Sequence, residues 1–325
     1  MNKLEKLDST VGALHKGFRA NGWMIERRKD SISEKETKYL VSSDSQISLR
    51  MADAKIWRHP ELTDQICKSK SMTKKFLGLN SVEFPSGAEF GLSQKDFAAA
   101  YVEKMGTDAV LKPAGSGGSR GVTVGVTPDN FEKAWAHAAH HVGADGQIIV
   151  EEFVKGIELR FLVIGGEVGG AVVRHQPFVI GDGAATIDEL IAALLIEQSH
   201  NARSAKRKIV PEEDFLAKQG YSLGSVLGQG EVAILSPFTI LARGGGTIDI
   251  TDLVSSELAE LAINAAASIP HLEVAGIDIL TESLDDAGVA KVVEVNTAAA
   301  LDLHRYPTYG IERDVVTKIV DYFCK

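Results

Sequence analysis

"VLKPAGSGGSRGVTVGV", residues 110–126, is the stretch that decides the fold. An apolar run ends in Lys112, a glycine- and serine-rich loop follows, and a second run with alternating apolar residues completes the stretch. A dinucleotide-binding fingerprint would need glycine at the sixth place from Gly115, where Arg120 stands, and would lead into a helix. A Walker loop would end in Gly-Lys-Ser or Gly-Lys-Thr, which this stretch lacks. The pattern therefore favours a strand–loop–strand hairpin whose backbone N–H groups, around Ser116, could line an anion site, although a plain surface hairpin fits the same residues.

The composition is that of a soluble globular protein. The chain has 325 residues, of which 44% are apolar and 24% charged, and its formal charge is −9. A negative charge of this size argues against a nucleic-acid or membrane-surface partner. The two cysteines, Cys67 and Cys324, form no disulfide framework, and the first residues, "MNKLEKLDST", show no apolar signal core. We therefore expect a cytoplasmic protein.

Apolar periodicity predicts a mixed set of helices and strands. We expect helices at 71–80, at 92–106 with Ser93 as N-cap, after a cap at Thr127 or Asp129, at 187–200 and at 256–269. We expect strands at 38–43, 46–52, 108–113, 147–154, 157–166, 167–176, 275–283 and 290–297. This order lacks the strict alternation of strands and helices that is typical of a doubly wound sheet, so the predicted fold class is α+β.

Three oxygen-bearing side chains near the end of the chain predict a metal site. Glu294 and Asn296 are two residues apart, so on a strand they face the same way at roughly 7 Å. Asp278 lies in another apolar strand, where an acid is costly to bury without a partner or a metal. Such ligands suit Mg²⁺, and two ions could share Glu294 and hold a transferring phosphoryl group. The alternative is a polar edge of exposed strand ends.

Eight motifs, in this order and spacing, make the sequence recognisable. They are "SKSMTKKFL", "VLKPAGSGGSRGVTV", "VEEFVKGIELRFLVIGG", "VVRHQPFVIGDGAATIDELI", "LAKQGYSLGSV", "GGGTIDITD", "VAGIDIL" and "VVEVNTAAALDLH". The chain resembles the ATP-grasp superfamily of carboxylate–amine ligases, most of all the ATP-grasp modules of cyanophycin synthetase and of bifunctional glutathione synthetases. The resemblance implies an α+β ATP-grasp fold. It also implies a small pre-grasp domain at 1–68 and an ATP-grasp domain at 69–325, which divides into a nucleotide lobe at 69–152 and a C-terminal lobe with the metal site at 153–325.

The resemblance also implies roles for residues at matched positions. Glu158 is similar to the acid that takes the ribose hydroxyls, and the loop would cover the phosphates. The other implied roles are phosphate binding by Lys70, Lys112, Ser116, Gly117 and Gly118, adenine binding by Glu151 with the backbone of Phe153 and Val154, and Mg²⁺ binding by Asp278, Glu294 and Asn296.

The reaction that the resemblance implies has two steps. A carboxylate attacks the γ-phosphate of ATP to give an acyl phosphate, and an amine then displaces phosphate to give an amide, with ADP released. The expected cofactors are ATP and two Mg²⁺ ions, with Mn²⁺ able to substitute, and the expected partners are a small carboxylic acid, an amine and a second copy of the chain in a homodimer. A module without the larger relatives' other ligase domains suggests dipeptide synthesis. The alternatives are a carboxylate–thiol or other acyl-phosphate ligase, and a regulatory ATP-binding protein without turnover.

Departures from the family pattern lie near the expected acceptor site. Ala299 and Ala300 stand where the family usually has Pro-Gly after the metal-binding asparagine. Asp302 stands where cyanophycin synthetase relatives tend to carry a base, so Asp302 and His304 are candidate substrate residues, although Asp302 could simply be exposed.

A cation that many ATP-grasp ligases carry is also missing. Many of them have an arginine two places before the first metal-binding aspartate, and here that place is Gly276. Arg174 matches a family arginine and Arg243 precedes three glycines, so both are candidate catalytic residues that could neutralise the charge on the reacting carboxylate. The alternative is that each forms an ordinary surface ion pair. We expect Arg174 to be the charge clamp.

Overall fold

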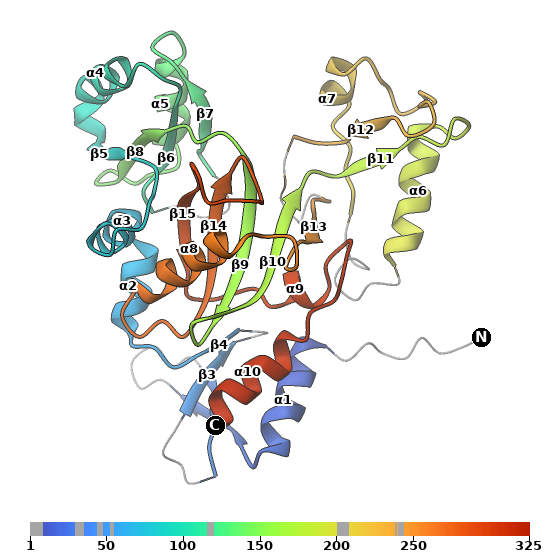
Figure 1. Ribbon diagram of the computed structural model, residues 1–325. Helices are drawn as coiled ribbons and strands as arrows, with labels where there is room; N and C mark the ends of the chain where they lie inside the picture. Colours follow the sequence, from blue (N-terminus) through green and yellow to red (C-terminus); the bar gives the residue numbers. More distant parts are fainter. Residues whose placement is uncertain are drawn as a thin grey trace. The chain divides into compact units, whose positions relative to one another are not determined.

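The computed structural model describes residues 9–29, 36–43, 48–52, 55–115, 120–199, 208–237, 239 and 244–325 (Figure 1). The helices are α1 (Thr10–Ala20), α2 (Glu61–Lys68), α3 (Lys70–Leu79), α4 (Lys95–Met105), α5 (Phe131–Ala139), α6 (Ile187–Gln198), α7 (Glu213–Lys218), α8 (Ser256–Ala267), α9 (Asp302–Arg305) and α10 (Val315–Cys324), with a 3₁₀ turn η1 at Leu92–Gln94. The strands are β1 (Met24–Lys29), β2 (Glu36–Val41), β3 (Ser48–Ala52), β4 (Lys55–Trp57), β5 (Gly87–Gly91), β6 (Ala109–Pro113), β7 (Thr123–Val126), β8 (Gln147–Glu152), β9 (Ile157–Ile164), β10 (Glu167–His175), β11 (Phe178–Ile180), β12 (Val232–Ile234), β13 (Gly246–Asp249), β14 (Val274–Thr281) and β15 (Lys291–Asn296).

The chain forms two compact units, and each is built from separate stretches of sequence. The first unit comprises Met1–Ile56, Gly169–Asp252 and Ala300–Lys325, and the second comprises Trp57–Val168 and Leu253–Ala299. The domain boundaries predicted after residues 68 and 152 stay predictions. None of the described helices is long and apolar enough to cross a membrane.

The second unit contains a four-stranded antiparallel sheet in the order β5-β8-β6-β7. Leu111, Ile148 and Val150 are buried in one hydrophobic cluster with residues of α4 and α5, so these helices cover one face of the sheet. Side chains alternate between the faces of a strand, and Lys112 and Glu151 therefore lie on the opposite face. We call this the nucleotide face; it also carries Gly87, Glu89 and Ile149, which pair with each other or with Lys112 and Glu151 across the strands.

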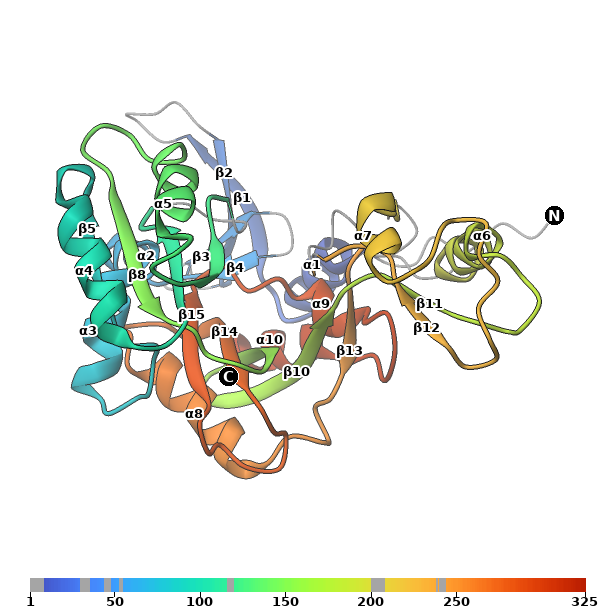
Figure 2. The same cartoon turned by 90° about the horizontal axis from the view of Figure 1, so that it is seen from above.

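The second unit also contains the neighbouring antiparallel strands β9, β14 and β15. Helix α8 packs against all three strands, as both Figure 1 and Figure 2 show. Leu159, Phe161, Ile277 and Ile279 are fully buried, and their register places them together on one face. The polar residues between them in sequence therefore face the other way.

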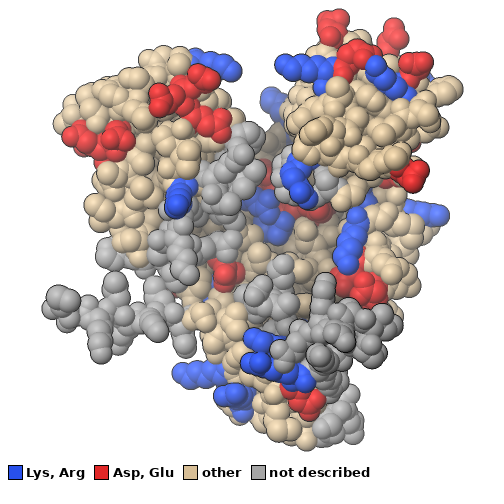
Figure 3. All heavy atoms as spheres, turned by 180° about the vertical axis from the view of Figure 1, so that it is seen from behind, with Lys and Arg blue, Asp and Glu red and all other residues tan. Residues whose placement is uncertain are grey.

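The first unit holds the remaining strands and the end of the chain. Strands β1 to β4 form an antiparallel sheet, β10 pairs with β13, and β11 pairs with β12 next to α6. Helix α1 packs against α10, and a side chain at Gly17 would meet Val320 at 2.8 Å. On the face of the molecule that Figure 3 shows, Lys and Arg side chains are mixed with Asp and Glu side chains.

The α+β fold class and the expected helices and strands are confirmed, but the predicted helix caps are wrong. Ser93 lies inside η1, and α4 begins at Lys95 after Gln94, whose side chain accepts a hydrogen bond from the N–H of Gly91 at 2.8 Å. Helix α5 begins after Asn130, whose side-chain oxygen accepts from the N–H of Thr127 at 2.9 Å. In both places the polar side chain next to the helix forms a local turn that the sequence pattern alone does not distinguish from a cap.

Candidate nucleotide and metal site

Polar side chains gather on the face of β9, β14 and β15 that α8 does not cover. Asp278 pairs with Glu294 on β15 and with Arg160 on β9, so all three point to the same side. Asn296 lies two residues beyond Glu294, and Glu158 lies two residues before Arg160, so they share this side as well. The structure thus brings together the three predicted metal ligands and the predicted ribose-binding acid on one sheet face, with an arginine among them.

Arg160 and Asp278 form a buried ion pair. The guanidinium Nε donates to one carboxylate oxygen and NH2 donates to the other at 2.6 Å. The two side chains are only 7% and 5% exposed. A bidentate pair of this kind fixes the carboxylate in one orientation. Sequence reasoning missed Arg160; the signal was a charged residue inside the otherwise apolar strand "IELRFLVI".

The guanidinium of Arg160 fills the space beside Gly276. A Cβ at residue 276 would lie 3.1 Å from NH1 of Arg160, closer than most Cβ contacts. The predicted missing arginine falls at this position, and the guanidinium beside it in this chain is that of Arg160 on the neighbouring strand β9.

The donor set fits a hard divalent cation. The Nδ2 of Asn296 points to the carboxylate of Asp278, at 3.3 Å, and to the carbonyl oxygen of Gly276, at 3.4 Å, which leaves the amide oxygen Oδ1 for a cation. A carboxylate has about four lone-pair positions, so Asp278 keeps capacity beyond its bonds to Arg160 and Asn296. The described parts of the chain contain no group of three His, Cys, Asp or Glu that could hold a metal, and the set at this sheet face consists of two acids and an amide. Mg²⁺ needs few protein oxygens when phosphate completes its shell.

On the nucleotide face, Glu151 accepts hydrogen bonds from two lysines, Lys112 of β6 and Lys74 of α3. Lys112 Nζ donates to one oxygen of Glu151, and Lys74 Nζ donates to the other at 2.7 Å. Lys70 begins α3, one turn before Lys74. Burial lowers the pKa of Lys70, the carboxylate of Glu294 acts in the opposite direction, and the ammonium of Lys112 lowers it further. Lys70 and Lys112, the predicted phosphate lysines, therefore lie close enough to affect each other, as do Lys70 and the predicted metal ligand Glu294.

Hydrogen bonds hold the end of β8 and the residue that follows it. Glu152 accepts from the N–H of Ser86 at 2.9 Å and from Lys291 Nζ, so it joins three segments of the second unit. The N–H of Phe153 donates to the carbonyl oxygen of Asp108 at 3.0 Å. Phe153 can therefore offer a ligand its carbonyl oxygen and its half-exposed ring, but not its N–H. Of the backbone groups of Phe153, only the carbonyl oxygen remains for the predicted contact with adenine.

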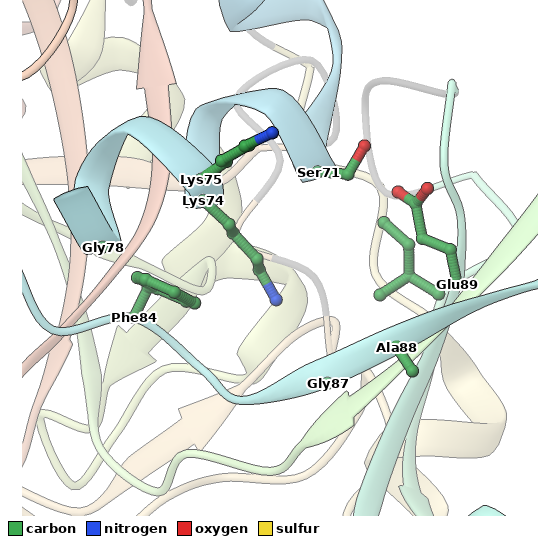
Figure 4. A pocket seen from close by; sticks show the side chains of 9 residues that line it. Ser71, Lys74, Lys75, Gly78, Phe84, Gly87, Ala88 and Glu89 are labelled. Atoms are coloured by element: carbon green, nitrogen blue, oxygen red, sulfur yellow. The ribbon is translucent and has the colours of Figure 1, made fainter.

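A cavity of about 450 Å³ opens on the nucleotide face (Figure 4). Its lining includes Lys74 and Ser71 from α3 and, from the sheet, Gly87, Glu89 and Ile149. The cavity lies within the range of 300–1,000 Å³ usual for small-molecule sites. It adjoins the Lys74–Glu151–Lys112 cluster because Gly87 pairs directly with Glu151 and Ile149 with Lys112.

A second hydrogen-bonded group holds the segment after the metal-binding strand. Thr297 donates to Asp64 Oδ1 at 2.6 Å, and the ring of the buried His59 lies 3.1 Å from the same oxygen. Burial disfavours the charged form of Asp64, but the bonds from Thr297 and His59 outweigh it, so the pKa of Asp64 lies below its usual value. Helix α2 therefore anchors the residue that follows Asn296.

The remaining predicted site residues lie in the first unit or outside the described residues. Arg174 lies on β10 opposite Thr247. In α9, Asp302 accepts a hydrogen bond from the hydroxyl of Thr10, and His304 is buried beside Gly170. Arg243 and the loop residues Ser116, Gly117 and Gly118 are outside the described residues.

Known proteins are similar to this chain in sequence and in fold. Residues 68–177 match the family model of the ATP-grasp (A) domain of phosphoribosylglycinamide synthetase. The crystal structure of a bifunctional glutathione synthetase from Pasteurella multocida covers 96% of the chain with a TM-score of 0.70 at 23% identity, and the chain covers 42% of that structure. The chain therefore contains an ATP-grasp domain, as its motifs predicted. Proteins of this family use ATP with Mg²⁺.

The curated proteins that are similar to the chain include proteins of two kinds. A glutathione biosynthesis bifunctional protein from Clostridium perfringens is 30% identical over 96% of the chain and 40% of its own length. Cyanophycin synthetase from Trichormus variabilis is 31% identical over 79% of the chain and 29% of its own length. The chain thus spans less than half the length of these relatives, and the similarity concerns their ATP-grasp parts.

Proposed function

We propose that the chain is an ATP-dependent ligase that joins a small carboxylic acid, such as an amino acid, to an amine, such as a second amino acid. The observation that carries the proposal is the composition of the second unit. One sheet face holds Asp278, Glu294 and Asn296, and the same compact unit holds Lys70 and Lys112 within electrostatic reach of one another. Oxygen donors for a cation next to lysines for phosphates are what phosphoryl transfer from ATP requires.

In the proposed reaction the chain binds and orients the reactants. Asp278, Glu294 and Asn296 would hold Mg²⁺, and we propose that two ions bind there. The metal would neutralise the negative charge of the phosphates. Lys70 and Lys112 act as point charges for the phosphates, because an ammonium binds phosphate without a fixed orientation. The carboxylate substrate then takes the γ-phosphoryl group, ADP leaves, and the amine displaces phosphate from the acyl phosphate.

Three further residues are proposed to contact the substrates. Arg174 is proposed as the clamp for the reacting carboxylate, and Asp302 and His304 as residues that face the acceptor. Arg160 already holds Asp278 on the sheet face, so it keeps that ligand oriented while charge builds up nearby. A homodimer and a cytoplasmic location stay predictions.

A phosphate-release screen tests the proposal. The full chain is incubated with ATP, Mg²⁺ and pairs of amino acids, and products are identified by mass spectrometry. A ligase releases phosphate only when both an acid and an amine are present and yields their amide. Phosphate release that never depends on a second substrate contradicts the proposal. Formation of a thioester, when a thiol replaces the amine, supports the carboxylate–thiol alternative, and tight ATP binding without release under any pair supports a regulatory ATP-binding protein.

A further inference from the structure

Lys74, Glu151 and Lys112 form a buried cluster with two cations and one anion. Lys74 and Lys112 each donate to a different oxygen of Glu151. Their side chains are 16% and 8% exposed, and that of Glu151 is 4% exposed. Formally, this cluster of three side chains carries one net positive charge. Because the cluster is shielded from water, this charge acts on its surroundings more strongly than an exposed one would.

The local backbone keeps Lys74 in this place. Its Nζ also donates to the carbonyl oxygen of Pro85 at 2.7 Å, just before β5. At Gly87 a Cβ would lie 2.5 Å from the carbonyl oxygen of Val150 and 2.7 Å from the Cβ of Glu151, so only glycine fits. Figure 4 shows Lys74 extending from α3 toward β5, whereas Lys75 points away from that strand.

We propose that Lys74 is a positioning residue that serves as the counter-ion of Glu151 and so leaves the charge of Lys112 for the phosphates of the nucleotide. This inference rests on the proposed function, in which Lys112 binds phosphate. Without Lys74, the carboxylate of Glu151 would neutralise Lys112, and the nucleotide face would carry one positive charge fewer. Burial and the nearby ammonium of Lys112 disfavour the charged form of Lys74, and burial is the larger effect, so its pKa lies below its usual value; Glu151 partly offsets this.

A purely structural role for Lys74 makes a different prediction. If Lys74 only ties α3 to β5 and β8, its loss should weaken every ligand of this face by the same factor. If it sets the charge of the face, its loss should weaken phosphate-bearing ligands selectively. The ratio of the affinities for ATP and for adenosine therefore separates the two roles.

The experiment is calorimetric titration of the full chain with adenosine, ADP and ATP. The variants are Lys74→Met, Lys74→Arg, the double variant Lys74→Met/Glu151→Gln, and Lys104→Met as a matched control, since Lys104 is an exposed lysine of α4, the helix that covers the other face of the sheet. A charge within about 6 Å alters a neighbouring ionic equilibrium by roughly 10- to 1000-fold. We expect Lys74→Met to lower the ATP-to-adenosine affinity ratio by about 10-fold or more.

The other variants sharpen the outcome. Lys74→Arg should keep most of the ATP-to-adenosine affinity ratio, and Lys104→Met should leave that ratio unchanged. The double variant should restore the ratio because the anion that neutralises Lys112 is gone. An equal loss for adenosine and ATP in Lys74→Met, or a double variant that restores nothing, overturns the inference while the proposed function stands. Wild-type protein that binds no ATP overturns the proposed function and this inference with it. If Lys74→Met does not fold, the double variant and Lys74→Arg decide.

Discussion

Replacing Arg160 by methionine tests the buried ion pair on which the sheet face depends. The variant leaves Asp278 inside the protein without its bidentate partner. Both side chains are less than 10% exposed, at 7% and 5%. Breaking a buried pair by removing one partner costs about 3–5 kcal/mol. For a domain of about 150–250 residues, this corresponds to a fall in Tm of roughly 6–20 °C.

The chain offers a matched control on its surface. Arg58 also donates two hydrogen bonds to one carboxylate, that of Glu273, and lies in the same unit, but the two side chains are 40% and 21% exposed. Exposed pairs contribute about 0.2–1 kcal/mol. We therefore expect Arg58→Met to lower Tm by no more than about 4 °C.

The assay is urea and thermal unfolding of both variants at neutral pH, followed by circular dichroism. The double variant Arg160→Met/Asp278→Asn should recover much of the loss, since neither charge remains. If Arg160→Met is no less stable than Arg58→Met, the interpretation of Arg160 and Asp278 as a stabilising buried pair is refuted.

Three further predictions concern the reaction and the anchor behind it. Glu294→Ala should abolish ATP turnover in the phosphate-release assay, because the proposed ligand shared by both metal ions is lost, and turnover within a few-fold of wild type would rule out that role. Arg174→Met should slow amide formation by on the order of 100-fold with calorimetric ATP affinity nearly unchanged, and a variant of wild-type rate would show that Arg174 is not the clamp. Asp64→Asn should be less stable than wild type in urea at pH 7. Since the pKa of Asp64 is lowered in the folded chain, the contribution is present above its usual value of 3.8 and is lost as the pH falls below it. The gap between the two unfolding curves should therefore narrow toward about pH 3.5, and a gap independent of pH would contradict the assignment.

The predictable parts of the site are those that depend on local sequence. The period of two placed Glu294 and Asn296 on one side of a strand, and the expected strands around Asp278 and Lys112 are present as β14 and β6. The antiparallel pairing that aligns Asp278 with Glu294 was not predicted, although the two strands follow each other in the sequence. The alternation of side chains along a strand repeats every two residues, so it can be recognised in a single sequence.

The missed residues are those whose partners are distant in the sequence. Arg160 meets Asp278 only because β9 lies beside β14, and Lys74 meets Glu151 only because α3 lies near the sheet. Lys291 joins Glu152 for the same kind of reason. Residue type gives each of these side chains a charge but not a partner. The wrong helix caps had a different cause, since Gln94 and Asn130 compete locally with the expected capping residues.

The discontinuity of the second unit sets an order of events during synthesis on the ribosome. The chain leaves this unit after Val168 and returns at Leu253, so Arg160 emerges 118 residues before Asp278. At about 5–20 residues per second, β9 therefore waits roughly 6–24 s for the strand that neutralises its arginine. Throughout that interval the cation favours solvent over burial, and β9 lacks the hydrogen-bonding partner that β14 provides. A nascent chain stalled before residue 274 should consequently expose β9 to protease, and one stalled well beyond residue 296 should protect it.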